Sequence, residues 1–248
     1  MNDRRPVVLI TGASRGIGAA TAVRCASQGW DVVVNYATNA GAADEVVARC
    51  VDAGADAVAL GADVSDEQQV MAMFAEVDDL FDGLDAVVNN AGVLGKQGTF
   101  DTFDGERLRR VVETNVLGAM YVAREAFGRM VAGGGGVLVN VGSRASSFGS
   151  PGEYVDYAAT KGAVDTLTIG LASEGGPHGI RVNCVRPGII DTDIHASGGD
   201  AGRVQRIAPS IPLRRPGTAD EVADTICWLL SDQASYVTGA LLDVGGGR

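Results

Sequence analysis

Histidine and cysteine are scarce in this sequence of 248 residues. The two histidines, His178 and His195, stand apart with no metal-ligand spacing, and the four cysteines form no CxxC pair. Each cysteine lies among apolar residues, as Cys184 does in "RVNCVRPG". We therefore expect buried thiols in a reducing compartment and no metal site.

Long apolar runs and basic clusters are also missing. No apolar run approaches the roughly 20 residues that span a bilayer. The N-terminal "MNDRRPVVLITGAS" enters a strand almost at once, unlike a secretory signal. Lys and Arg number 20 against 31 Asp and Glu, which gives a net charge of −11 and no basic stripe. The sequence therefore predicts a cytoplasmic protein with no nucleic-acid or membrane partner.

The chain is rich in short apolar runs that alternate with helical patterns. The expected strands span residues 7–11, 31–36, 57–60, 86–92, 137–143, 181–188 and 241–244. Helical patterns over 17–29, 66–81 and 107–131 lie between some of them. Continuous apolar strands indicate a parallel sheet covered on both faces, and the alternation predicts a doubly wound α/β fold. Because no linker interrupts it, we expect one domain over 1–248.

The first expected strand leads directly into "TGASRGIG" (11–18), in which Gly12, Gly16 and Gly18 are spaced as GxxxGxG. Glycines let the backbone approach a pyrophosphate, and the N-terminus of the following helix offers unpaired N–H groups. At the first strand–helix turn of an alternating chain, this pattern predicts a dinucleotide site rather than a purely structural turn.

Further motifs follow in order: "NNAG" (89–92), Asn115, Ser143, "YAATK" (157–161) and "RPG" (186–188). Together with the glycine turn they resemble the short-chain dehydrogenase/reductase family over the whole chain. The overall similarity is to the branch that contains oxoacyl-carrier-protein reductases and bacterial glucose dehydrogenases. The resemblance implies a Rossmann-type sheet of seven parallel strands in the order 3-2-1-4-5-6-7, with helices on both faces.

The resemblance also implies roles for individual residues. The catalytic group would be Asn115, Ser143, Tyr157 and Lys161, with Asn115 holding a water that relays protons to Lys161. Ser143 and Tyr157 are 14 positions apart, where close relatives often show 13, and we place the extra residue in "SSFGSPGE". The implied cofactor contacts are Gly12, Ser14, Arg15, Gly16, Ile17, Gly18, Asn35, Asp63, Val64, Asn90, Ala91, Gly92, Tyr157, Lys161, Pro187, Gly188, Ile190 and Thr192.

Two tyrosines, Tyr154 and Tyr157, precede the single lysine of this segment, Lys161. On a helix, positions i and i+4 are neighbours, so Tyr157 and Lys161 would share one face. A nearby cation lowers the pKa of a phenol from about 10. We therefore expect Tyr157 to be the general acid/base and Tyr154 to line the pocket or pack in the core. A serine at a strand end, Ser143, would donate a hydrogen bond to the reacting oxygen.

The longest irregular stretch contains several glycines and prolines. It predicts a substrate-side lid over about 190–216, which includes His195. The second strand ends with Asn35 and Tyr36, where an acidic residue would select NAD(H), and Arg15 lies within the glycine turn. These residues predict NADP(H) as the preferred cofactor, with NAD(H) as the second option.

The function expected is interconversion of an alcohol and a ketone or aldehyde on a small molecule. A sugar dehydrogenase and an oxoacyl reductase are both kept open, although the acidic chain disfavours docking of an acidic carrier protein. The alternative is a non-catalytic NAD(P)-sensing regulator, which would have no need of all four catalytic residues. The helices that carry Asn115 and Tyr157 are apolar enough to be covered on more than one side. The resemblance implies that they form the contact of a homotetramer.

Overall fold

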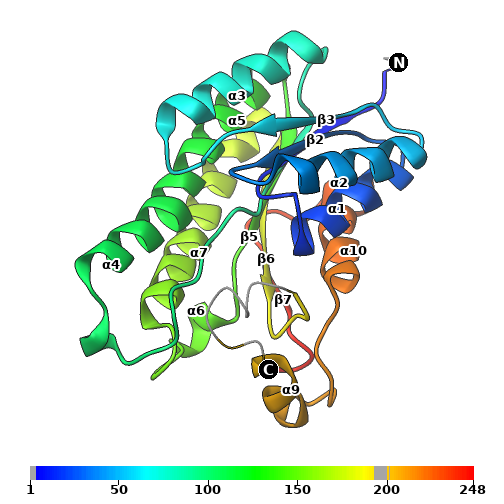
Figure 1. Ribbon diagram of the computed structural model, residues 1–248. Helices are drawn as coiled ribbons and strands as arrows, with labels where there is room; N and C mark the ends of the chain where they lie inside the picture. The colour runs from blue at the N-terminus through cyan, green and yellow to red at the C-terminus, as the bar shows by residue number, and fades with distance from the viewer. Residues whose placement is uncertain (1–3, 193–199, 201) are drawn as a thin grey trace.

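The computed structural model describes residues 4–192, 200 and 202–248. Within them one parallel sheet has seven strands in the order β3-β2-β1-β4-β5-β6-β7, so the predicted fold class and strand order are confirmed (Figure 1). The strands are β1 (Val7–Ile10), β2 (Asp31–Tyr36), β3 (Ala57–Gly61), β4 (Ala86–Asn89), β5 (Gly136–Val141), β6 (Ile180–Pro187) and β7 (Leu241–Val244).

Helices cover both faces of the sheet. One face packs against α1 (Gly16–Ser27), α2 (Ala40–Asp52) and α10 (Ala219–Leu230). The other packs against α3 (Glu67–Leu80), α5 (Ala119–Gly133) and α7 (Val155–Gly175), with α4 (Gly105–Val112) leading into α5. Shorter elements are α6 (Ala145–Phe148), α9 (Arg203–Ile207), η1 (Phe100–Thr102), η2 (Glu113–Gly118), η3 (Gly176–His178), η4 (Ala208–Ser210) and η5 (Asp232–Ala234). No helix in the described ranges is both long and apolar enough to cross a membrane.

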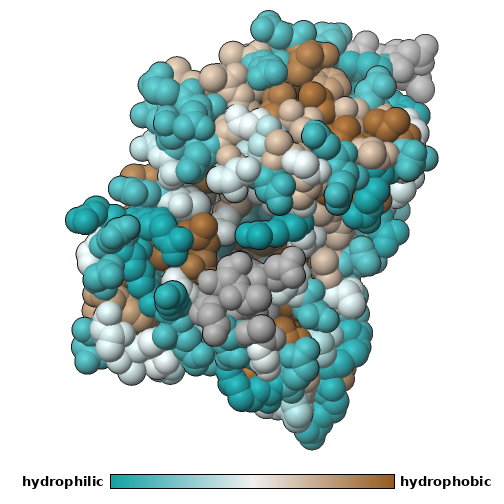
Figure 2. All heavy atoms as spheres, viewed as in Figure 1, coloured by the Kyte–Doolittle hydropathy of each residue, from teal (hydrophilic) through white to brown (hydrophobic). Residues whose placement is uncertain are grey.

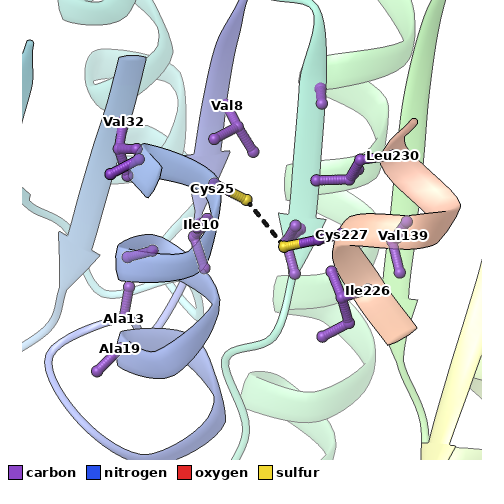
Figure 3. Packing of buried hydrophobic residues seen from close by; sticks show 14 of the residues in the cluster. Val8, Ile10, Ala13, Ala19, Cys25, Val32, Val139, Ile226, Cys227 and Leu230 are labelled. Carbon is purple, nitrogen blue, oxygen red and sulfur yellow. Dashed lines mark hydrogen bonds between the residues drawn. The ribbon is translucent and has the colours of Figure 1, made fainter. Parts of the chain in front are cut away.

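The cysteines are packed inside this layered core. All four are free and buried, as predicted. Figure 3 shows Cys25 of α1 facing Cys227 of α10, with the two Sγ atoms 3.5 Å apart. The hydrogen bond with Cys227 and burial raise the pKa of Cys25 well above its usual value. Such thiols stay protonated and unreactive at neutral pH.

A chain of buried amides fixes α5 and α7 against the sheet. Asn89 Nδ2 donates to the carbonyl of Ala119 at 2.9 Å and to Asn140 Oδ1 at 3.1 Å. Asn140 Nδ2 in turn donates to Thr168 Oγ1 of α7 at 2.9 Å. Buried hydrogen bonds of this kind contribute about 1 kcal/mol each and are costly to leave unmade. They hold the start of α5 and the middle of α7 beside the carboxyl ends of β4 and β5.

The segment expected to form the lid is only partly irregular. Ile190 pairs with Gly217 in an isolated parallel bridge, and α9 and η4 lie between them. Residues 193–199 and 201, including His195, lie outside the described residues. In Figure 1, α9 lies near the C-terminus of the chain, and Figure 2 shows a hollow near the middle of the same face.

Candidate functional site

The glycine turn lies where β1 meets α1 and is held against the "NNAG" turn. Gly12 has φ +61°, and a Cβ there would lie 3.0 Å from Ala91 Cα. A Cβ on Gly18 would lie 2.7 Å from both the Gly12 carbonyl oxygen and Asn90 Nδ2. Thr11 Oγ1 accepts hydrogen bonds from the backbone N–H groups of Asn90 and Ala91 at 2.9 and 3.0 Å. Only glycine fits these close approaches, so the two turns form one rigid cradle.

A groove of about 590 Å³ runs along this cradle. Most residues expected to touch the cofactor line it, while Gly18 is packed behind the turn. The expected residues that line it are Gly12, Ser14, Arg15, Gly16, Ile17, Asn35, Asp63, Val64, Asn90, Ala91, Gly92 and Thr192. The volume of the groove and the positive φ of Gly12 and Gly16 fit a dinucleotide whose pyrophosphate rests on the N-terminus of α1.

Asn35 braces the groove from inside. It is 1% exposed, and its Oδ1 accepts from the Gly12 N–H at 3.1 Å. Its Nδ2 donates to the carbonyls of Leu60 at 3.2 Å and Ala62 at 3.0 Å. Asn35 therefore ties the glycine turn to β3, a function that the strand pattern did not reveal.

The exposed residues that could select the cofactor lie after β2, slightly later in the chain than Asn35 and Tyr36, where we expected them. Ala37, Thr38 and Asn39 are exposed and line the groove, and Asn39 Oδ1 accepts from the Ala42 N–H to cap α2. Opposite them, Arg15 is exposed at the N-cap of α1, with no ion-pair partner among the described residues. Ala37, Thr38 and Asn39 could have been found from the sequence, because they directly follow the second strand.

A second cavity of about 120 Å³ adjoins the groove and contains the reacting side chains expected from the sequence. Ser143 at the end of β5 lines it together with Tyr157 and Lys161 of α7. The expected residues Pro187, Gly188 and Ile190 line it as well. Four residues, Ile17, Asn90, Gly92 and Thr192, line both hollows. The spaces therefore meet at these residues.

The electrostatics of Tyr157 differ from the expectation. Burial raises the pKa of Tyr157 to about 12, although the Ser143 hydroxyl and the charge of Arg203 lower it. Lys161 Nζ lies 5.6 Å from the centroid of the Tyr157 ring and donates to the Val141 carbonyl at 2.7 Å. Burial lowers the pKa of Lys161 to about 8. The prediction that Lys161 lowers the pKa of Tyr157 is wrong, because burial dominates and the lowering contributions come from Ser143 and Arg203.

Asn115 lies in a π-helical turn, η2, which splits the predicted helix 107–131 into α4 and α5. Its Oδ1 accepts from the Val93 N–H at 2.8 Å, and its Nδ2 donates to the Val93 carbonyl at 3.0 Å and to Thr160 Oγ1 at 3.2 Å. The asparagine that disfavours regular helix thus marks a π turn, a common feature of functional sites. Its side chain therefore braces the segment after "NNAG". Gly92 packs closely beside it, since a Cβ on Gly92 would lie 3.3 Å from Asn115 Oδ1 and 3.5 Å from Lys161 Nζ.

The segment where we placed the extra residue bends sharply. Gly149, Ser150 and Gly152 all have positive φ, at 73°, 46° and 71°. Ser150 is a buried non-glycine residue in this conformation and lines the cavity. Tyr154 also lines the cavity, with a side chain that is 2% exposed. Both expectations for Tyr154, pocket and core, therefore hold.

The sequence reasoning missed the arginines of this cavity. Arg144, Arg203 and Arg248 all line it. They come from the end of β5, from α9 and from the end of the chain, so no local motif joins them. Among the described residues there is also no group of three or more His, Cys, Asp or Glu that could hold a metal ion.

Comparison with known proteins agrees with this architecture. The family model described as "Enoyl-(Acyl carrier protein) reductase" matches residues 12–248. An uncharacterized oxidoreductase of Escherichia coli strain K12, YgfF, is 55% identical over 98% of this chain and 99% of its own. The 3-oxoacyl-(acyl-carrier-protein) reductase FabG of Staphylococcus aureus is 37% identical over 96% of both chains.

Solved structures give the same result. A 3-ketoacyl-(acyl-carrier-protein) reductase from Brucella melitensis complexed with NADH has a TM-score of 0.91 and 33% identity over 98% of both chains. Levodione reductase has a TM-score of 0.89 and 31% identity, again over 98% of both chains.

With the groove, the cavity and these relatives, the class of protein is defined: it is an oxidoreductase that acts on carbonyl or alcohol groups. The chain belongs to the short-chain dehydrogenase/reductase family, whose members use NAD(P)(H). The comparisons give no support to the alternative of a cofactor sensor without chemistry.

Proposed function

We propose that this protein is an NADP(H)-dependent oxidoreductase that interconverts an alcohol and a ketone or aldehyde on a small substrate. The supporting observation is that Ser143, Tyr157 and Lys161 share one small cavity that joins the dinucleotide groove at Gly92 and Thr192. A substrate carbonyl in that cavity would meet the hydroxyl groups of Ser143 and Tyr157 close to the cofactor groove.

The chemistry is divided between the cofactor and the chain. A nicotinamide dinucleotide, when bound, supplies or accepts the hydride. Tyr157 donates a proton to the carbonyl oxygen as reduction proceeds, and its raised pKa keeps the phenol protonated at neutral pH. Ser143 donates a hydrogen bond to the same oxygen and stabilises its developing negative charge. Lys161 supplies a nearby amine for the ribose hydroxyls, and Asn115 braces the wall behind it.

The test of this assignment is the Tyr157→Phe variant. Removing the general acid lowers kcat with NADPH and a carbonyl substrate by at least ~10³-fold. Its ring still fills the same space, so the affinity for NADPH stays within a fewfold. Ser143→Ala loses about 10²-fold in kcat, as for a single oxyanion donor. Substantial turnover by purified Tyr157→Phe would contradict the role of the phenol.

The preference for NADP(H) is supported by the charges at the adenosine end of the groove. Arg15 is exposed without an ion-pair partner among the described residues, and the groove-lining residues Asn35, Ala37, Thr38 and Asn39 include no carboxylate. At these positions a 2′-phosphate would meet the Arg15 guanidinium and no carboxylate. Comparing kcat/KM for NADPH and NADH tests this, and a tenfold preference for NADH would overturn it.

The assembly proposed is a homotetramer. Apolar side chains stay exposed on neighbouring helices: Val112, Leu117, Met120 and Ile169. Exposed apolar groups gathered on packed helices favour contact with a second copy. Light scattering should give a mass near four times the 25.4 kDa of one chain. A stable monomer would contradict the tetramer and leave the chemistry unaffected.

A further inference from the structure

The small cavity has a charge opposite to that of the protein. Four cationic residues line it: Arg144, Lys161, Arg203 and Arg248. No aspartate or glutamate is among the described residues that line it, although the chain as a whole has a net charge of −11. Arg144 and Arg203 are ion-paired with Asp243 and Glu153, which do not line the cavity. The described lining itself therefore presents cationic and no acidic side chains, which favours anions.

Three buried polar atoms in the lining have no hydrogen-bond partner among the residues that the structure describes. They are Tyr154 Oη, Arg203 Nε and Arg248 Nη1. Tyr154 is 2% exposed and Arg203 is 6% exposed. An unsatisfied buried polar group costs about 1–3 kcal/mol, more when it is charged. Three such atoms around one cavity indicate a ligand that supplies the missing acceptors.

The surrounding contacts hold Arg203 in position without using its Nε. Arg203 Nη2 donates to Glu153 Oε2 at 2.5 Å. The Arg203 guanidinium carbon lies 5.3 Å from the centroid of the Tyr154 ring, so the two side chains lie against each other. Arg248 is placed similarly, with its Cζ 5.6 Å from the centroid of the Phe148 ring. A preorganised guanidinium with a spare N–H is well suited to an anionic oxygen.

We propose that the substrate carries an anionic oxygen group, a carboxylate or a phosphate, and that Arg203, Tyr154 and Arg248 bind it. This inference rests on the proposed function, because it concerns the end of the substrate opposite the reacting carbon. Arg203 Nε, Tyr154 Oη and Arg248 Nη1 donate to the anion. Glu153 is a positioning residue that orients Arg203.

The anion site lies close to the reacting end of the cavity. The cavity of about 120 Å³ also contains Ser143 and Tyr157. The charge of Arg203 reaches the Tyr157 phenol, since it lowers the pKa of that group. A substrate that spans both ends therefore has few carbon atoms between its carbonyl and its anion.

Matched pairs of substrates test this inference with the full-length enzyme and NADPH. One arm compares straight-chain oxo acids, with one, two or three methylene groups between carbonyl and carboxylate, with their methyl esters. The other arm compares dihydroxyacetone phosphate with dihydroxyacetone. We expect the anionic member of at least one pair to have a kcat/KM at least tenfold higher. The arm in which this occurs identifies the anion.

Variants then connect the preference to the named residues. Arg203→Met should lower the ratio of kcat/KM for anionic over neutral substrate about 100-fold, as for loss of a buried charged partner. Tyr154→Phe removes only the hydroxyl and should lower the ratio about tenfold, which keeps the test valid if Arg203→Met folds poorly. Arg206→Met is the matched control, because Arg206 is exposed on the same helix and does not line the cavity. It should keep the wild-type ratio.

The outcomes separate this inference from the proposed function. Equal kcat/KM for anionic and neutral partners in every pair would overturn the anion site and leave the oxidoreductase proposal intact. A preference that survives both Arg203→Met and Tyr154→Phe would also overturn it. Absence of NADPH oxidation with every carbonyl compound, neutral or anionic, would instead contradict the proposed function itself.

Discussion

Two adjoining hollows at the carboxyl end of the sheet differ in charge and in how the chain builds them. The dinucleotide groove has two cations and two carboxylates in its described lining: Arg15, Arg110, Asp63 and Glu113. The cavity beside it has four cations and no carboxylate among the described residues. The groove is formed mainly by short turns that directly follow β1, β2, β3 and β4, with α4 and η2 adding Arg110 and Glu113. The cavity is assembled from α7, α9, the segment after β5 and the end of the chain.

The difference shows two ways of recognising a ligand. In the groove, glycines and backbone N–H groups shape a surface for a long ligand, and the charges nearly cancel. In the cavity, side chains from distant segments converge with spare donors and a net positive charge. We therefore expect changes in the groove to affect cofactor binding and stability, and changes in the cavity to affect substrate choice.

The largest effect should come from Gly18→Ala, which breaks the groove without touching the cavity. The added Cβ would lie 2.7 Å from the Gly12 carbonyl oxygen, a backbone atom that cannot move without opening the turn. We expect NADPH to bind at least ~100-fold more weakly, equivalent to about 2.7 kcal/mol, in a fluorescence titration.

Gly128→Ala is the control for that change. Gly128 is exposed on α5, and an added Cβ would meet nothing within 4 Å. It should bind NADPH like the wild type and be slightly more stable, because alanine favours helix over glycine. Equal affinity for NADPH in Gly18→Ala and Gly128→Ala would show that the turn is not the cofactor site.

Two variants near the end of β2, Asn35→Asp and Asn39→Asp, distinguish a residue that supports the glycine turn from one that recognises the cofactor. Asn35→Asp replaces the amide that donates to Leu60 and Ala62 with a buried carboxylate facing carbonyl oxygens. We expect a loss of about 2–3 kcal/mol in the free energy of unfolding, measured in urea. Asn35→Asp should therefore cost stability as well as change the charge beside the groove.

Asn39→Asp is the informative partner of that variant. Asn39 Oδ1 caps α2, and aspartate caps equally well. The exposed carboxylate should leave stability unchanged and shift preference from NADPH towards NADH. Full stability in Asn35→Asp would contradict the bracing role, and unchanged preference in Asn39→Asp would place the 2′-phosphate elsewhere.

The pH dependence of stability tests the buried amine of the cavity. Because the pKa of Lys161 is lowered to about 8, between about pH 8 and 10 the unfolded chain holds a proton that the folded chain has lost. The free energy of unfolding therefore rises with pH across that window, on the order of 2 kcal/mol from this group. Urea unfolding at several pH values should show that Lys161→Met loses this rise. Lys96→Met, at an exposed position, should keep it. The same slope in both variants would mean that Lys161 is solvated.

The smallest expected effect concerns the exposed arginine of the groove. Arg15→Ala should lower the ratio of kcat/KM for NADPH over NADH about tenfold, or about 1.4 kcal/mol. A solvated ionic contact is weaker than a buried one, so we expect a smaller change in the ratio than for Arg203→Met. An unchanged ratio would show that Arg15 is only a charge of the turn.

Much of the groove could be predicted because its signals are local. The glycines of "TGASRGIG" follow the first strand, and every predicted strand is present within a few residues at its ends. The "NNAG" turn was expected beside them, and Thr11 and Asn90 hold it there. Asn115 was expected among the catalytic residues, although the π turn that carries it was not foreseen.

Other features depend on segments that are remote in the chain. Ser143, Tyr157 and Lys161 were brought together as expected, yet the pKa of Tyr157 rises because the surrounding protein excludes water. Asn35 turns inward because β3 offers two carbonyls to its amide. Neither burial nor the direction of a side chain can be derived from spacing alone.

The sequence by itself determined the alternation of strands and helices, the glycine turn and the spacing of Tyr157 and Lys161 on one helix. These follow from backbone geometry over a few residues, where the periods of helix and strand apply. Only the tertiary structure decided that Arg203 and Arg248 join Tyr154 around one cavity. The reason is that desolvation and charge at a site are sums over every neighbour in space, and most of those neighbours are far away in the sequence.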